Sequence, residues 1–217
     1  MLLYFITDKI GINMIHIQGT IPREVYLAFS GGVDSTAALN FLHRNHRVTL
    51  VHVNHGNDIA QFEEREAQRA ANEYGLDLII YRGNSDVPRG VSREEHWRNQ
   101  RYEFFHSLNK PVITCHHLDD CVETWIWNMC NGRAKTIPYS NRNVIRPFRL
   151  NRKSEFMNWA IKRSLTWFED PTNNSADFAV RNRIRNEMMS SVLKVNPGIH
   201  TTIRNMLLKE NIGQLAE

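Results

Sequence analysis

Short apolar runs alternate with longer amphipathic stretches along most of this chain. Apolar runs bounded by turn residues predict buried strands, whereas apolar residues at helical spacing predict helices. We expect strands at 25–29, 48–53, 76–81, 112–115 and 144–148, and a short edge strand at 14–19. We expect helices from the glycine pair to 42 and at 61–74, 93–108, 118–130, 153–165, 177–195 and 199–209.

The alternation of strands and helices predicts an α/β fold. Strand–helix–strand units form right-handed crossovers, which produce a mainly parallel five-stranded sheet with helices on both faces, followed here by trailing C-terminal helices. In such a sheet a ligand binds beyond the carboxyl ends of the strands, where the strand order reverses. If the order is 3-2-1-4, the loops after the first and fourth strands lie side by side.

The length of 217 residues and the 41% apolar content favour one main domain with a sizeable core. We place that domain at 1–217, with an α/β core at about 22–150 and a helical part at about 151–217. The chain has no long uncharged apolar run of the length that spans a membrane. Residues 1–17 lack the pattern of a signal peptide, so we expect a cytoplasmic protein.

Charge and cysteine content narrow the function classes. The cysteines Cys115, Cys121 and Cys130 include no Cys-x-x-Cys pair, which argues against a disulfide framework and a four-cysteine metal site. The net charge is only +4, but residues 133–185 contain twelve Lys or Arg. This half of the chain is suited to phosphate or RNA, although a basic solvated face has the same composition.

The run Ser-Gly-Gly-Val-Asp-Ser at 30–35 follows the first strand and opens a helix. Its two glycines allow a sharp turn, and Asp34, Ser35 and Thr36 are expected to cap the helix. Backbone amides at the helix start would then face an anion. The run lacks the Gly-Lys-Ser ending of a Walker A loop and the third glycine of a dinucleotide fingerprint.

A second group of polar residues follows the fourth strand and contains His117, Asp119, Asp120 and Glu123. Residues three apart share a helix face, which places Asp120 beside Glu123. Helix capping alone would explain an isolated pair of aspartates. Because this loop is expected beside the glycine loop, we favour carboxylates that hold Mg²⁺ against phosphates.

Two sets of arginines have helical spacing. Arg98 and Arg101 share a face of the predicted helix at 93–108, and Arg181 and Arg185 are four apart near the C-terminus. The second pair is able to grip one phosphate. Surface salt bridges and a solvated basic face are the alternatives for these sets, and they contribute little stability.

The run at 30–35 resembles the PP-loop of ATP pyrophosphatases, and several further motifs match one family within them, the tRNA(Ile)-lysidine synthases. The shared motifs, in order, are Asn-His-Gly at 54–56, Glu94 with Arg-Asn-Gln-Arg-Tyr at 98–102, His-His-Leu-Asp-Asp-Cys-Val-Glu-Thr at 116–124, Ile-Arg-Pro at 145–147, Trp-Phe-Glu-Asp-Pro-Thr-Asn-Asn at 167–174 and Arg-Asn-Arg-Ile-Arg at 181–185. The resemblance covers about residues 25–192.

This resemblance implies an adenine nucleotide alpha hydrolase-like fold and a ligase that uses ATP and Mg²⁺. Its partners would be an isoleucine tRNA with a CAU anticodon and free lysine. The enzyme would adenylate the C2 oxygen of the wobble cytidine at tRNA position 34, after which the lysine amine displaces AMP and forms lysidine. The oligomeric state stays open, a homodimer being one option.

The resemblance also assigns roles to residues of this chain. It makes Asp34, Asp120 and Glu123 catalytic, with Asp34 and Asp120 as Mg²⁺ ligands. It gives tRNA or substrate binding to Arg181, Asn182 and Arg185. It gives ATP binding to Ser30, Gly31, Gly32, Val33, Asp34, Ser35, His55, His117, Arg98 and Arg101.

The chain departs from the family pattern in three places. The larger bacterial members carry further C-terminal domains that grip tRNA, and this sequence ends near the expected first trailing helix. The segment after Asn131 is shorter than usual, and Asn-Asp follows Gly56 where Leu-Arg is common. A related PP-loop tRNA thiolase and a non-catalytic module that binds ATP or tRNA are therefore retained as alternatives.

Overall fold

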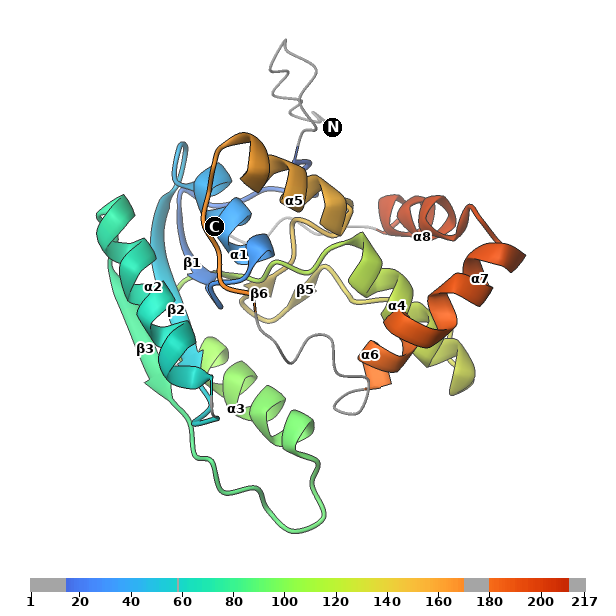
Figure 1. Ribbon diagram of the computed structural model, residues 1–217, viewed down its shortest axis with the longest axis horizontal. Coiled ribbons are helices and arrows are strands. Elements are labelled where there is room, and N and C mark those ends of the chain that lie inside the picture. The colour runs from blue at the N-terminus through green and yellow to red at the C-terminus, as the bar shows by residue number, and fades with distance from the viewer. Residues whose placement is uncertain (1–14, 58, 170–179, 211–217) are drawn as a thin grey trace.

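A computed structural model of the chain contains a six-stranded sheet with the strand order β3-β2-β1-β4-β6-β5 (Figure 1). The structure describes residues 15–57, 59–169 and 180–210. The strands are β1 (Glu24–Ala28), β2 (Arg47–Asn54), β3 (Leu78–Arg82), β4 (Val112–Ile113), β5 (Ser140–Asn141) and β6 (Val144–Ile145). The predicted order 3-2-1-4 is confirmed, and β5 adds a short strand that the hydrophobic pattern did not predict.

Most of the sheet is parallel, as the crossover rule requires. Strand β1 pairs in parallel with β2 and with β4, so that Leu27 lies opposite Leu50 on one side and Ile113 on the other. Only the pairing of β5 with β6 is antiparallel among the described strands. Strand β5 escaped prediction because its two residues, Ser140 and Asn141, are polar and exposed.

Helices cover both faces of the sheet. They are α1 (Val33–Leu42), α2 (Ala60–Tyr74), α3 (Arg93–Ser107), α4 (Leu118–Cys130), α5 (Lys153–Lys162), α6 (Val180–Arg183), α7 (Met189–Val195) and α8 (Ile199–Leu208), with a π-helix η2 at Ile184–Met188. Within the described ranges, every helix is too short or too polar to cross a bilayer.

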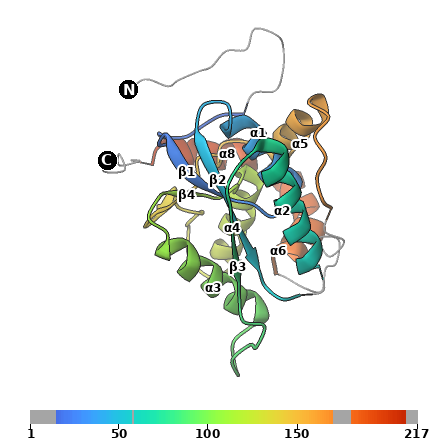
Figure 2. The same cartoon turned by 90° about the vertical axis from the view of Figure 1, so that its left-hand side faces the viewer.

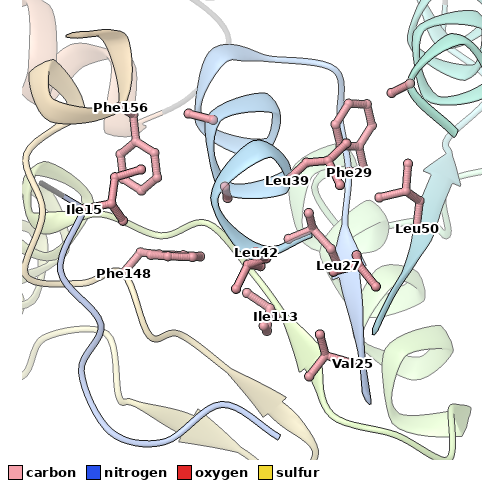
Figure 3. Packing of buried hydrophobic residues seen from close by; sticks show 14 of the residues in the cluster. Ile15, Val25, Leu27, Phe29, Leu39, Leu42, Leu50, Ile113, Phe148 and Phe156 are labelled. Atoms are coloured by element: carbon pink, nitrogen blue, oxygen red, sulfur yellow. The ribbon is translucent and has the colours of Figure 1, made fainter. Parts of the chain in front are cut away.

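Alternate residues of β1 enter different apolar cores. Val25 and Leu27 belong to the core under α1, α2 and α5, which is shown in Figure 3. Tyr26 faces the opposite side, where it joins Phe105 of α3. This burial on both faces explains why the strand reads as a continuous apolar run.

A third core joins α4 to the C-terminal helices. Leu118, Val122 and Ile126 of α4 lie in one buried cluster with Ile184, Ile203 and other residues from the end of the chain. In Figure 1, α6, α7 and α8 gather on the α4 side, at the far end of the molecule from α2 and β3. The helical part therefore covers the element that carries Asp120 and Glu123.

The predicted edge strand at 14–19 is wrong for its described part. Residues 15–19 have no strand pairing. Instead, His16 N donates to Asn151 Oδ1 at 2.6 Å, and Gln18 N donates to Pro147 O at 2.8 Å. The segment is also fixed by the buried side chain of Gln18, which bonds Arg149 and Leu207 O, and a hydrophobic pattern contains no signal for these polar contacts.

The helix predicted at 177–195 is confirmed over its described part, residues 180–195, but a π-helical turn at Ile184–Met188 interrupts its α-helical geometry. Ile184 is buried in the third core and its neighbour Arg185 reaches Glu123 of α4. Neighbouring residues of a regular α-helix point about 100° apart, so directing both toward α4 favours a wider turn. The predicted helix start at 177–179 and the predicted turn at 170–174 lie outside the described residues.

Candidate functional site

The turn after β1 requires glycine at its first position. Gly31 has a φ of +82°, in the left-handed region that favours glycine. A Cβ at this position would also lie 3.0 Å from the Cβ of Glu66 in α2. Two independent constraints therefore account for Gly31, and the second brings the loop into contact with α2.

The helix start after this turn has no side-chain cap, so the capping predicted for Asp34, Ser35 and Thr36 is wrong. The N-cap residue is Gly32, whose N donates to Ser30 Oγ at 3.5 Å, and within the described residues no side chain caps the amides that follow it in α1. Ser35 Oγ donates backward to Gly32 O at 3.0 Å, and Thr36 Oγ1 lies 3.4 Å from Gly31 O. Because these hydroxyls hold loop carbonyls, the amides at the helix start are available to an anion.

The loops after β1 and β4 meet across the switch point, as the strand order predicted. His117 Nε2 lies 3.8 Å from Asp34 Oδ2. The imidazole of His117 is only 3% exposed, so this approach occurs inside the protein. The parallel order β1–β4 thus brings together residues that are far apart in the sequence.

His117 and Asp120 cap α4 reciprocally. Asp120 Oδ2 accepts a hydrogen bond from His117 N at 2.9 Å, while Asp120 N donates to His117 Nδ1 at 3.3 Å. A neutral imidazole whose Nδ1 accepts carries its proton on Nε2, the atom that faces Asp34. Capping therefore explains part of the Asp-Asp motif, and the same bonds orient His117 toward the loop.

Asp34 has a half-buried side chain in which one carboxylate oxygen is buried. Its Oδ1 is buried and has no hydrogen-bond partner among the described residues. Burial raises the pKa of Asp34, while the charges of His117 and Lys153 act in the opposite direction. A buried carboxylate oxygen beside a loop whose helix amides are open to an anion fits a hard cation such as Mg²⁺.

Asp120 is less available to a cation than Asp34. Its Oδ2 caps α4, and its Oδ1 lies 3.7 Å from Arg185 NH2. In the part of the chain that the structure describes, no three His, Cys, Asp or Glu form a metal-binding group. Such a geometry fits an ion that takes one or two carboxylates and completes its shell with phosphates and water, as Mg²⁺ does.

Asp119, unlike Asp120, joins three elements. It accepts hydrogen bonds from Lys153 N at 2.8 Å and from Arg152 Nε at 3.1 Å, at the start of α5, and lies 3.2 Å from His200 Nε2 of α8. Burial disfavours its charge, but these bonds and the nearby His117 and Arg152 outweigh burial and hold the pKa of Asp119 well below its usual range. Asp119 therefore stabilises the packing of α4, α5 and α8.

The Asp119→Asn variant should lower the free energy of unfolding by about 2 kcal/mol at pH 7. A carboxyl with a depressed folded-state pKa stabilises the protein above its unfolded-state pKa of about 4 and loses this contribution at lower pH. The difference from the parent should therefore shrink between about pH 5 and pH 3 in urea titrations. The exposed Asp77→Asn serves as control, and a constant difference at every pH would contradict the assignment.

Glu123 pairs with Arg185 of η2 in a bidentate ion pair. Arg185 Nε lies 2.7 Å from Glu123 Oε1, and Arg185 NH2 lies 2.9 Å from Oε2. Burial raises the pKa of Glu123, and the guanidinium of Arg185 opposes that change. Asp120 and Glu123, which the sequence predicted to share a helix face, both lie near the guanidinium of Arg185. Arg185 belongs to the residues predicted to bind tRNA.

The remaining predicted site residues lie farther along the carboxyl edge or beyond the described side chains. The His55 ring stacks on Trp97 with centroids 5.3 Å apart, and burial together with the charge of Arg101 lowers the pKa of His55 to about 4. Arg98 lies over the ring of Tyr102. Asn182 is half-buried in α6, and the side chain of Arg181 is outside the described structure.

Two contributors were missed by the sequence analysis. Lys153 opens α5 and influences the charge of Asp34, although no local motif distinguishes it from other lysines. Phe168 N donates to Gly31 O at 2.9 Å, which ties the Trp-Phe-Glu-Asp motif to the glycine loop. The sequence showed the motif, but it did not show that the motif contacts the glycine loop.

Comparison with known proteins gives a family and several relatives. A PP-loop domain model matches residues 8–192. The chain is 32% identical over 201 residues to a tRNA(Ile)-lysidine synthase of Persephonella marina, covering 83% of this chain and 44% of the relative. It is 30% identical over 202 residues to the Lactococcus lactis protein of the same name, covering 84% and 45%. The chain spans less than half the length of these curated relatives.

Among solved structures, an NH3-dependent NAD synthetase from Campylobacter jejuni, in complex with nitrate, is similar over 91% of each chain. The sequence identity is 14% and the TM-score is 0.44.

Proposed function

Because the chain belongs to the PP-loop domain family, we propose that it uses ATP to activate a tRNA base for attack by an amine. The proposed substrates are ATP, free lysine and an isoleucine tRNA with a CAU anticodon. The products are lysidine at the wobble position, AMP and pyrophosphate. The observation that carries this proposal is the approach of His117 to Asp34 at 3.8 Å, which joins the glycine loop to the Asp120 loop. The names of the relatives support the choice of substrate.

The loop from Ser30 to Ser35 is assigned to the phosphates of ATP. No described side chain caps the first amides of α1, and their partial positive charge suits the pyrophosphate that leaves. Asp34 and Asp120 would hold Mg²⁺, which neutralises phosphate charge when it is bound. The buried Oδ1 of Asp34 supports this role most directly.

The proposed reaction has two steps that balance. The C2 oxygen of the cytidine attacks the α-phosphorus, and the bond from that phosphorus to pyrophosphate breaks. The lysine amine then attacks C2, and the bond from C2 to the oxygen of AMP breaks. The amine must lose a proton before or during its attack, and a carboxylate among Asp34, Asp120 and Glu123 is the proposed acceptor.

The arginines and His55 retain separate roles in this proposal. We assign Arg98, Arg101 and His55 to ATP, on the side of the sheet edge where His55 stacks on Trp97. We assign Arg181, Asn182 and Arg185 to tRNA. Arg185 already pairs with Glu123. A contact of Arg185 with tRNA would therefore place its positive charge between the RNA and the proposed catalytic carboxylates.

The thiolase alternative is disfavoured by the surroundings of Cys115, which is half-buried, and of Cys121, which is buried. Burial raises the pKa of Cys115 well above its usual value and that of Cys121 to about 12. A thiol that attacks or carries sulfur works as the thiolate, which a raised pKa suppresses. Cys130 is exposed, and it lies at the end of α4 away from the loop.

The direct test incubates the protein with ATP, Mg²⁺, lysine and a tRNA(Ile) transcript that has a CAU anticodon. We expect AMP release that depends on both lysine and tRNA, together with a product nucleoside whose mass corresponds to the addition of lysine with loss of water. Incorporation of sulfur would instead support the thiolase. Tight tRNA binding without AMP release would support the non-catalytic module.

The pH dependence of the reaction tests the role of Asp34. Activity requires its carboxylate, and a carboxylate is lost as the pH falls through its pKa. Because burial raises that pKa, the acid limb of kcat/KM should lie above the ordinary range of about 4. Mg²⁺ competes with the proton for this carboxylate, so the limb should be measured at limiting Mg²⁺ and should move to lower pH as Mg²⁺ is raised. An acid limb that does not respond to Mg²⁺ would remove Asp34 from the proposed ligands.

A further inference from the structure

Two aromatic side chains beside the glycine loop are not used by the mechanism. Phe62 of α2 is 51% exposed, and Phe168 is half-buried in the segment after α5. Both are absent from the three apolar cores of the described structure, although the adjacent Trp167 packs against the first of them. Exposed aromatic pairs of this kind commonly mark a binding surface.

The two rings form an ordered platform with an arginine. Their planes are within 5° of parallel, and their centroids are 6.4 Å apart. The guanidinium carbon of Arg65 lies 4.8 Å from the centroid of Phe62. We refer to Phe62, Phe168 and Arg65 as the aromatic platform.

The aromatic platform is fixed to the candidate active site by the backbone. Phe168 N donates to Gly31 O at 2.9 Å, and Arg69 NH2 lies 3.4 Å from Thr166 O. In Figure 2 the segment after α5 runs down beside α2. The platform thus borders the phosphate loop on its α2 side, whereas Asp120 and Glu123 lie on its α4 side.

We propose that the aromatic platform stacks an unpaired base of the RNA substrate that flanks the reacting nucleotide. This inference rests on the proposed function for the identity of the RNA. Bases stack on aromatic and guanidinium planes with little sequence preference, and a positive side chain at the same place attracts the phosphodiester backbone. The platform supplies both kinds of contact. Phe62 and Arg65 lie within one turn of α2, and Phe168 comes from the neighbouring segment after α5.

The openness of the platform favours RNA over the adenine of ATP. Phe62 is half exposed and Arg65 is exposed, so a ligand here stays in contact with solvent. Small-molecule sites are usually concave and enclose most of their ligand, whereas a nucleic acid strand lies across an open surface. Arg65 also adds a charge suited to a phosphodiester.

The test measures RNA binding by the full chain with two labelled probes, the anticodon stem–loop of the proposed tRNA and a mixed-sequence single-stranded RNA. Phe62→Ala and Phe168→Ala should each raise Kd about tenfold for both probes. Phe168→Trp should keep the affinity of the parent protein. Arg65→Ala should reduce the slope of log Kd against log salt by about one. The KM for ATP should not change in Phe62→Ala or Arg65→Ala, the two variants on α2.

Controls separate this inference from folding and from the proposed function. Ile161→Ala alters another exposed apolar residue and should leave both Kd values unchanged. Thermal unfolding reports on the fold, and the bond from Phe168 N to Gly31 O is kept because it involves only backbone. Unchanged Kd values in both alanine variants would overturn the inference, as would a higher KM for ATP alone.

The two proposals fail in different ways. If the parent protein makes no lysidine but the alanine variants still lose affinity for single-stranded RNA, the platform stands and the proposed function falls. If lysidine forms and the variants bind both RNAs normally, the proposed function stands and the platform falls.

Discussion

The Asp34→Asn variant should lower lysine-dependent AMP release by about a thousandfold. Asparagine keeps the size of the side chain but removes the negative charge that faces the switch point. The buried Oδ1, which has no partner among the described residues, supports a role in holding a cation, and His117 approaches the other oxygen. Pyrophosphate and AMP should be measured across a Mg²⁺ titration, where we expect a higher Mg²⁺ requirement in the variant.

The same variant should fold at least as well as the parent. Burial disfavours the charge of Asp34, as the direction of its pKa change indicates, so loss of that charge should not lower the free energy of unfolding. Asp77→Asn is the matched control, because it makes the same chemical change at an exposed residue ahead of β3. Near-normal AMP release by Asp34→Asn at every Mg²⁺ concentration would exclude this carboxylate from the chemistry.

The Arg185→Ala variant should lower the free energy of unfolding by about 3 kcal/mol. It removes a bidentate partner from Glu123, whose side chain is 4% exposed, and also removes the cation near Asp120. An unpaired buried carboxylate is far more costly than the pair contributes net. Urea unfolding at neutral pH measures the loss directly.

A double-mutant cycle identifies the source of that loss. Glu123→Gln should recover part of the stability lost in Arg185→Ala, because it removes the stranded charge. The exposed pair of Arg47 and Glu24 is the matched control, and Arg47→Ala should cost less than about 1 kcal/mol. Additive effects of the two substitutions at 123 and 185 would show that the ion pair is not the stabilising interaction.

The order of the elements was readable from the sequence because parallel strands buried on both faces are continuous apolar runs. The runs around Leu27, Leu50 and Ile113 were therefore visible, and crossover handedness then limited the strand order. The short polar strand at Ser140 and the π-helical turn at Ile184 were not visible. Both depend on contacts made by neighbours rather than on a repeating pattern.

For the candidate site, the residue types in the sequence were enough to predict a kind of chemistry. The fold decided which groups each of those side chains contacts. The two adjacent aspartates illustrate the difference. Asp119 and Asp120 look equivalent in the sequence, yet Asp119 joins α4 to α5 and α8, whereas Asp120 caps α4 and turns toward Arg185. A helix separates consecutive side chains by about 100°, so the elements packed around α4 determine what each carboxylate meets.

By itself, the sequence determined a glycine turn after a buried strand, a carboxylate-bearing loop after another, and their adjacency at the switch point. These features follow from local steric limits and from the hydrophobic pattern. Only the tertiary structure decided that Asp34 keeps a buried oxygen with no partner in the described part of the chain, that Arg185 neutralises Glu123, and that Phe168 is held against Gly31. Each of these contacts joins residues that are distant in the sequence, so burial and packing of the whole chain determine them.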